Sequence, residues 1–227
     1  MLYWLVIGGK TMIMDLPKDF AGNGRDVFIE NGILKIYKNV PFRKLVYELT
    51  FKIKGGKHRC LYCKREVANN KVTLDHLYPQ DMGGPTITNN LLPCCSRCNA
   101  EKSNMTAKEY KRFLMLKHTG DERQYFKILQ QKKELLRSLN EYQIPDEWLS
   151  EHDVSDIVLY LQLYNFKGSN KYRRTNAFYE QYGYFQKPII VDQNGFLLDG
   201  FYNVFYAKMH NISSLKAIML ENVEVIL

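Results

Sequence analysis

The chain has 227 residues, of which 45% are hydrophobic and 25% charged, with a formal net charge of +8. This composition is that of an ordinary soluble globular protein and excludes a fibrous or disordered chain, and the length allows one large domain or two small ones. The sequence pI of about 9.1 favours a polyanionic partner, of which nucleic acid is the first candidate.

Residues 1–56 are predicted to form a β-rich N-terminal extension. The apolar run Leu2–Ile7 predicts a short strand, and residues 27–37 predict a hairpin about Asn31-Gly32, because both positions of an Asn-Gly turn accept positive φ. The first residues lack a basic flank and are too few to cross a bilayer, so we expect no membrane association. A helix is predicted to start at Pro41.

All five cysteines lie between positions 60 and 98. Four of them form two C-x-x-C pairs, the spacing of a zinc knuckle: Cys60, Cys63, Cys95 and Cys98. Four thiolates complete a tetrahedral shell with no open position, so we expect structural Zn²⁺. Cysteines gathered at metal spacing indicate a reducing compartment, and we place the protein in the cytoplasm. The fifth, Cys94, is predicted to be a small buried residue.

Two helices are predicted after the second cysteine pair. Thr106-Ala-Lys-Glu109 has the capping-box pattern, so the first helix should run to about His118, and the second should begin near Asp121. The apolar stripe of the second helix is predicted to be core: Tyr125, Ile128, Leu129, Leu135, Leu136 and Leu139. Its basic face is either solvated or lies along DNA: Lys127, Lys132, Lys133 and Arg137.

A linker at 140–145 is predicted to end a domain of residues 57–140. Residues 146–227 have an α/β rhythm, with strands at 187–191, 196–199 and 215–220 and a helix at 201–210. The stretch Val154–Leu163 is ambiguous between helix and strand.

The pair Asp75-His76 ends a β-type run between the two cysteine pairs. A carboxylate suits a hard divalent ion such as Mg²⁺ or Mn²⁺, and an imidazole suits deprotonation of water. Together they can promote in-line attack on a phosphodiester. Because neighbouring side chains on a strand point to opposite faces, a distortion at the strand end is needed to bring both to one site.

A longer set of positions follows this pair in register: Asp75-His76-Leu77-x-Pro79, Gly83-Gly84, Asn90-Leu91 and Cys95-x-x-Cys98-Asn99-x-x-Lys102. This set closely resembles the HNH endonuclease family of ββα-metal nucleases, in the branch clamped by zinc. The resemblance implies an α+β fold with a zinc-stabilised ββα-metal nuclease core.

The resemblance also implies a role for each matched position. His76 would be the general base, Asp75 and Asn99 the ligands of a catalytic Mg²⁺ or Mn²⁺, Asn90 the residue that orients the histidine, and Lys102 a phosphate contact. Asn99 stands where many members have histidine, as in the H-N-N variant.

The basic run before the first knuckle includes Lys57 and Arg59, which we expect to contact phosphate or to form a solvated face. The partner expected from the resemblance is DNA, double-stranded. The competing interpretation is a non-catalytic zinc-dependent DNA-binding module.

Residues 187–200 and the helix that follows show a weaker resemblance to the N-terminal domain of ParB-like and sulfiredoxin-like proteins. In that superfamily, arginines after the glycine that opens the helix hold a nucleotide phosphate. Here Phe201, Tyr202 and Asn203 stand in those places. We therefore expect a small α/β domain that docks DNA or a partner protein. The same domain could also pair two copies of the chain. The third alternative for the function is a nucleotide-binding protein.

A basic and aromatic cluster precedes this region: Lys171, Tyr172, Arg173 and Arg174. It fits either a nucleic-acid contact or an ordinary exposed turn.

Overall fold

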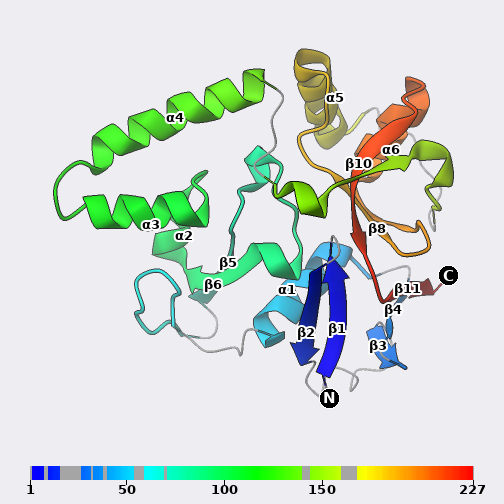
Figure 1. Ribbon diagram of the computed structural model, residues 1–227, viewed down its shortest axis with the longest axis horizontal. Coiled ribbons are helices and arrows are strands. Elements are labelled where there is room, and N and C mark those ends of the chain that lie inside the picture. Colours follow the sequence, from blue (N-terminus) through cyan, green and yellow to red (C-terminus); the bar gives the residue numbers. More distant parts are fainter. Residues whose placement is uncertain are drawn as a thin grey trace. The chain divides into compact units, whose positions relative to one another are not determined.

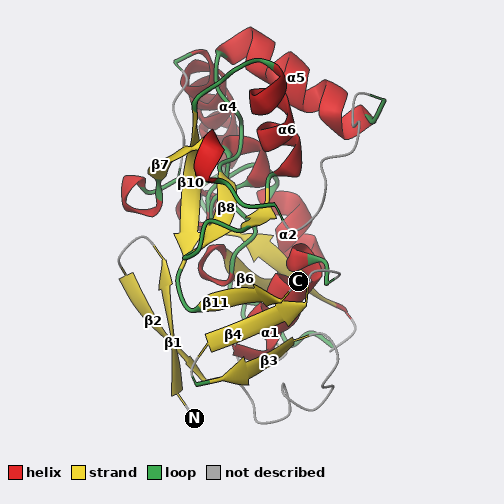
Figure 2. Cartoon of the chain, turned by 90° about the vertical axis from the view of Figure 1, so that its right-hand side faces the viewer, coloured by secondary structure: helices red, strands yellow, loops and turns green. Residues whose placement is uncertain are grey.

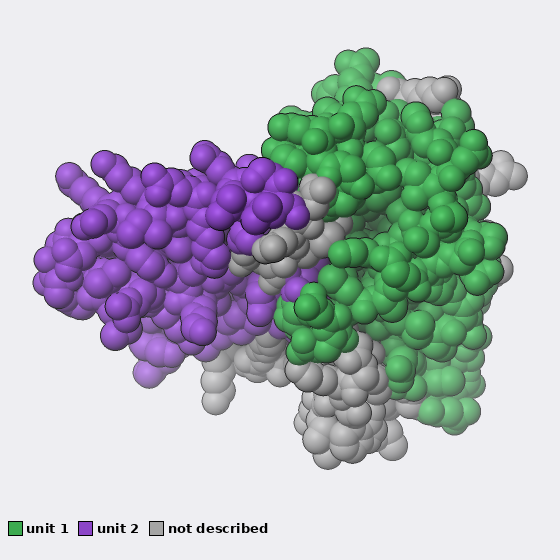
Figure 3. Space-filling model, turned by 45° about the horizontal axis from the view of Figure 1, so that its top comes forward, with its two compact units in different colours: residues 1–45, 145–227 green, residues 46–144 purple. Residues whose placement is uncertain are grey.

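The computed structural model describes residues 2–7, 10–15, 27–31, 33–37, 40–53, 59–68, 71–139, 144–159 and 168–226. Contacts divide the chain into two compact units, coloured separately in Figure 3. Unit 1 comprises Met1–Leu45 and Pro145–Leu227, and unit 2 comprises Val46–Ile144. The N-terminal strands, which we expected to form an extension of their own, share a unit with the C-terminal region.

Strand pairing explains this grouping (Figure 2). The six strands of the main sheet in unit 1 are β1 (Leu2–Ile7), β2 (Lys10–Asp15), β7 (Ser150–Asp153), β8 (Ile189–Asp192), β9 (Leu197–Asp199) and β10 (Ser214–Leu220). They run in the order β2-β1-β10-β8-β9, with β7 also paired to β10. The link between the two ends of the chain is the antiparallel pairing of β1 with β10, at Ile7 and Leu220.

A second sheet of unit 1 joins the chain ends again. It contains β3 (Val27–Glu30), β4 (Ile33–Tyr37) and β11 (Val223–Ile226), in the order β11-β4-β3. β3 and β4 pair antiparallel with Glu30 opposite Ile33, and Asn31 has a φ of 53°. The predicted hairpin is therefore confirmed, although Gly32 lies outside the described residues.

The predicted succession of strand, turn, strand, helix and strand in the C-terminal region is also confirmed. It is formed by β8, β9, α6 (Phe201–Met209) and β10. α6 buries Val204 and Ala207 completely in the core that it shares with β8 and β10. The basic cluster lies on a helix, α5 (Asn170–Tyr182), whose first turn is capped by the Ser169 side chain accepting from the Tyr172 N–H.

The ambiguous stretch begins with a 3₁₀ turn at Val154–Asp156, and residues 160–163 lie outside the described part.

Unit 2 combines helices and strands, as expected for an α+β nuclease core (Figure 1). Its elements are α1 (Phe42–Ile53, which begins in unit 1), β5 (Val72–His76), β6 (Leu91–Cys95), α2 (Ser96–Lys102), α3 (Ala107–Leu116) and α4 (Glu122–Ser138). β5 and β6 form a two-stranded antiparallel sheet, and α2 follows β6 directly. Within the part of the chain that the structure describes, no helix has the length and apolarity needed to cross a membrane.

The capping box of α3 is confirmed. The Thr106 hydroxyl accepts from the Glu109 N–H at 3.2 Å, and the Glu109 carboxylate accepts from the Thr106 N–H at 2.8 Å. These two bonds satisfy N–H groups that a helix start leaves without partners. The local signal therefore placed the start of α3 correctly.

The prediction that the apolar stripe of α4 is core was wrong. α4 has no buried residue, and Ile128, Leu135 and Leu139 are 52%, 57% and 56% exposed. Only one part of the stripe is half-buried: Tyr125, Leu129 and Leu136. The apolar stripe is wider than the surface that packs against it, because the main packing partner of α4 among the described elements is a single helix, α3.

Candidate active site

The four predicted zinc ligands converge in unit 2. The Sγ atoms of Cys60, Cys63, Cys95 and Cys98 all lie within 4.8 Å of one another. A tetrahedral zinc ion with Zn–S bonds of about 2.3 Å places its sulfurs about 3.8 Å apart, and the Cys63–Cys95 sulfur separation is 3.9 Å. The Cys98 N–H also donates to the Cys95 sulfur at 3.4 Å. This donor set fits structural zinc.

Cys94 is not part of this set. It is 1% exposed, and its sulfur lies 3.4 Å from the Thr73 hydroxyl. Burial raises the pKa of Cys94 to about 12, which keeps it a neutral thiol. For Cys60, burial raises the thiol pKa, but backbone hydrogen bonds at Cys95, Cys63 and Tyr62 outweigh it and bring the pKa to about 7. The structure confirms Cys94 as a small buried residue.

The cysteine cluster is continuous with the hydrophobic core of unit 2. Cys60 and Cys98 pack with Tyr62, Met105 and Tyr110. The Tyr110 side chain is fully buried and donates to the Glu101 carboxylate of α2 at 2.6 Å. A metal at this place therefore ties the turn at 60–63 and the start of α2 to the packing of α3.

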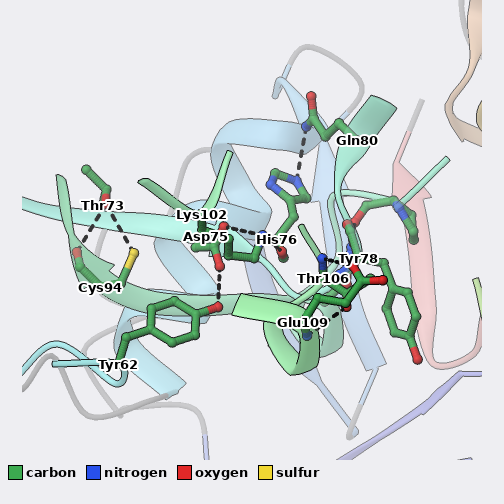
Figure 4. Close-up of polar contacts among 12 residues, drawn as sticks. Tyr62, Thr73, Asp75, His76, Tyr78, Gln80, Cys94, Lys102, Thr106 and Glu109 are labelled. Carbon is green, nitrogen blue, oxygen red and sulfur yellow. Dashed lines mark hydrogen bonds and ion pairs between the residues drawn. The ribbon is translucent and has the colours of Figure 1, made fainter. Parts of the chain in front are cut away.

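Asp75 lies in a buried ion pair with Lys102, shown in Figure 4. Its Oδ1 accepts from the Lys102 ammonium at 2.9 Å, and its Oδ2 accepts from the Tyr62 hydroxyl at 2.5 Å. Lys102 also donates to the His76 carbonyl at 2.8 Å. Burial raises the pKa of Asp75, and Lys102 and Tyr62 act against that rise. Both oxygens of the carboxylate are thus engaged inside the protein.

This pair corrects two expectations. Lys102 is 1% exposed, so it does not face solvent and is not placed to contact a phosphate. Asp75 and His76 were expected to converge through a distortion of the strand end, but β5 and β6 keep a regular register with Asp75 opposite Leu92 and His76 opposite Leu91. The two side chains therefore point to opposite faces of the strand.

The His76 imidazole is held by two side chains that sequence reasoning missed. Its Nε2 lies 3.0 Å from the Thr86 hydroxyl and 3.0 Å from the Gln80 amide nitrogen. Gln80 in turn donates to Thr86 at 2.8 Å. No spacing rule points to these residues, because both belong to the irregular loop between β5 and β6.

Asn90 does not orient His76 by direct contact, which corrects the expected role. It is fully buried, and its Oδ1 accepts from the Tyr78 N–H at 2.8 Å. Its Nδ2 donates to the carbonyls of Tyr78 at 3.0 Å and Pro85 at 2.8 Å. Asn90 thus clamps both ends of the loop that carries Gln80.

The Gly83-Gly84 pair permits this tight loop. Gly83 has a φ of 87°, which favours glycine. A Cβ on Gly84 would lie 1.9 Å from the Tyr78 carbonyl oxygen, so no side chain fits there. The Gly84 N–H donates to the Pro79 carbonyl at 2.9 Å. The pair therefore brings the Thr86 hydroxyl back to the imidazole.

The remaining predicted residues are placed as follows. Asn99 is half-buried on α2, and it shares a face with Lys102 because positions three apart on a helix are neighbours. Arg59 is exposed and pairs with Glu66 at 3.3 Å. Lys57 lies outside the described residues.

Lys102→Met is expected to lower the free energy of unfolding by about 3–5 kcal/mol, because it leaves the Asp75 carboxylate buried without its cation. Urea denaturation measures this, with Lys108→Met at an exposed position of α3 as the matched control. The double variant Asp75→Leu/Lys102→Met should recover most of the loss. An unchanged unfolding midpoint in Lys102→Met would contradict the buried pair.

Comparison with known proteins locates this site within a family. A search of curated proteins found no match to the chain. Residues 60–115, about a quarter of the chain, match the family model described as HNH endonuclease. The matched segment contains the four zinc-site cysteines, the Asp75-His76 pair, Asn90 and Asn99. Residues 60–115 are therefore a domain of the HNH endonuclease family, a family that points to a nuclease or DNA-binding function.

Proposed function

We propose that the chain is a metal-dependent HNH endonuclease that hydrolyses phosphodiester bonds of double-stranded DNA in the cytoplasm. The observation that carries the proposal is the held imidazole of His76, at the end of β5 and inside the segment that matches the family. The gathering of the four cysteines at metal-binding distance supports the compartment, because chains of oxidising compartments use their cysteines for disulfide frameworks.

In this proposal His76 removes the proton from the attacking water. An imidazole does so only when it is neutral and one ring nitrogen carries a lone pair. The amide of Gln80 selects that nitrogen. The amide nitrogen of Gln80 can only donate, so the His76 Nε2 that it faces at 3.0 Å carries the lone pair, and the ring proton lies on Nδ1. Gln80 and Thr86 are therefore positioning residues.

The catalytic ion, Mg²⁺ or Mn²⁺, would be held by Asp75 and Asn99. A carboxylate and an amide oxygen are ligands that such hard cations accept. Asp75 already binds a positive charge, the Lys102 ammonium, so the ion would have to displace that ammonium from Oδ1. When bound, the ion would stabilise negative charge on the phosphate and the leaving oxygen.

The second candidate is a zinc-dependent DNA-binding module without catalysis. The specific observation that favours it is the engagement of both Asp75 oxygens by Tyr62 and Lys102. In this case the cluster of thiols would still order the domain, and positive charge would still attract DNA.

Incubation of the protein with supercoiled plasmid distinguishes the two candidates. We expect nicked or linear DNA in the presence of Mg²⁺ or Mn²⁺ and intact plasmid in EDTA. Zinc content measured before and after EDTA treatment controls for loss of the structural ion. A gel shift without any cut DNA would contradict the nuclease and favour the binding module.

For the C-terminal region we propose a small α/β domain of the ParB and sulfiredoxin type that docks DNA, a partner protein or a second copy of the chain. The order β8, β9, α6 and β10 supports it. Asn203, at the start of α6, is buried and donates to the Lys187 carbonyl at 2.8 Å, so it holds the backbone. Calorimetric titration with nucleoside triphosphates tests the nucleotide-binding alternative, for which we expect no heat of binding.

A further inference from the structure

Unit 2 contains an open cavity of about 750 Å³, and His76 is not among the residues that line it. Its walls come from the loop after β5, at Leu77 and Tyr78, from α3, and from α4 at Tyr125, Leu129 and Lys132. A volume of this size lies within the range of about 300–1,000 Å³ that small ligands occupy. The cavity is large enough for one nucleotide and open at the surface for the rest of a strand.

Three cations of α3 line one wall of this groove: Lys108, Lys111 and Arg112. They occupy positions i, i+3 and i+4, which share one face of a helix, and all three are exposed. The only carboxylate among the lining residues is that of Glu109, and its negative charge is neutralised by an ion pair with Lys132 of α4 at 3.1 Å. Within the described residues, no ion pair neutralises the three α3 cations. The groove is therefore positively charged.

The rest of the lining is apolar and aromatic. Leu77 and Leu129 are half-buried, and so are the rings of Tyr78 and Tyr125. Cations beside aromatic rings are the combination with which proteins bind single-stranded nucleic acid, since phosphates pair with the cations and bases stack on the rings.

The groove begins next to the reactive histidine. Leu77 and Tyr78 directly follow His76, so the Tyr78 Cα lies within about 8 Å of the His76 Cα. The Ala107 N–H donates to the Leu77 carbonyl at 2.9 Å, which fixes the start of α3 against the same loop. A strand whose scissile phosphate lies at His76 would enter this groove within one or two nucleotides.

We propose that the groove between α3 and α4 binds a nucleotide that has left the base-paired duplex, on the strand that flanks the scissile phosphate. Lys111, Arg112 and Lys108 hold its phosphates, and Tyr125 supplies the ring on which its base stacks. This inference rests on the proposed function, because it treats the groove as part of the substrate path of the same site.

Fluorescence anisotropy with a labelled single-stranded oligonucleotide of about 12 nucleotides, in EDTA, tests the phosphate contacts. For Lys111→Gln/Arg112→Gln we expect weaker binding and a salt slope lower by about 1.4, the value for two contacts on a single strand. The matched control is Arg123→Gln/Lys127→Gln, two exposed cations of α4 that do not line the groove. Equal affinities and slopes for the two double variants would overturn the proposal.

Tyr125 tests the base contact. Tyr125→Leu removes the ring and keeps the bulk, and it should weaken single-strand binding about tenfold or more while leaving a blunt duplex unaffected. Tyr125→Phe keeps the ring and should bind like the unchanged protein. Equal losses for single strand and duplex in Tyr125→Leu would show that no base is seated there.

The failure of this inference differs from the failure of the nuclease proposal. If the protein cuts plasmid but the groove variants bind as the unchanged protein does, the groove proposal falls and the nuclease stands. If the protein never cuts DNA but loses single-strand affinity in Lys111→Gln/Arg112→Gln, the groove stands as a binding site and the nuclease falls.

Discussion

His76→Ala is expected to lower single-turnover DNA cleavage by about two to four orders of magnitude, the usual contribution of a positioned base. The structure gives a reason for the fold to survive this change. Gln80 and Thr86 remain hydrogen-bonded to each other at 2.8 Å when the imidazole is removed, so neither is left without a partner. Zinc content and DNA affinity should stay near those of the unchanged protein, while the rate falls.

Two further variants make this measurement specific. His118→Ala changes an exposed histidine of the turn after α3 and should cut at the unchanged rate. Gln80→Leu keeps the imidazole but removes one of its two hydrogen-bond partners. Misplacement of a catalytic group lowers the rate by up to about a hundredfold, so the cleavage rate of Gln80→Leu should fall between those of His118→Ala and His76→Ala. Cleavage by zinc-loaded His76→Ala at the unchanged rate would mean that the base has been assigned to the wrong residue.

Loss of the zinc site is expected to unfold unit 2. Apparent binding free energies of structural zinc are about 10–16 kcal/mol in zinc-finger peptides, which is as large as the total stability of about 5–15 kcal/mol that is usual for a domain. The cysteine cluster is continuous with the core around Tyr62 and Tyr110. Cys98→Ser should therefore abolish the cooperative thermal transition of unit 2 and lower the zinc content.

The fifth cysteine supplies the control. Cys94→Ala changes a buried cysteine next to Cys95 but outside the sulfur cluster. It should keep stoichiometric zinc and a cooperative transition, with a modest loss of stability from the removed sulfur. A folded and active Cys98→Ser protein without zinc, measured by metal analysis, would contradict a structural role for the metal.

Some features of this protein follow from short stretches of sequence. The two C-x-x-C pairs identified the four sulfurs, and the pattern from Thr106 to Glu109 identified the start of α3. The order of β8, β9, α6 and β10 could also be predicted. In each case neighbouring residues carry the signal, because turn, cap and knuckle geometry depends on contacts within a few positions.

Other features depend on partners far apart in the chain, so no local pattern reveals them. Lys102 was expected at a phosphate, but α2 lies against β5 and turns its ammonium to Asp75, 27 positions away. The stripe of α4 was expected in the core, but helical spacing shows which residues share a face and not how much of that face a neighbour covers.

The same limit applies to the candidate active site and to the chain ends. Sequence motifs indicated His76, whereas Gln80 and Thr86 reach it only because Gly84 lets the loop backbone approach Tyr78. The N-terminal strands were expected to stand apart, and pairing of β1 with β10 and of β4 with β11 joins them to the C-terminal region. The sequence by itself determined the four cysteines whose donor set fits structural zinc and the family that residues 60–115 match. The tertiary structure decided which side chains meet around His76 and Asp75, because those contacts depend on non-local packing.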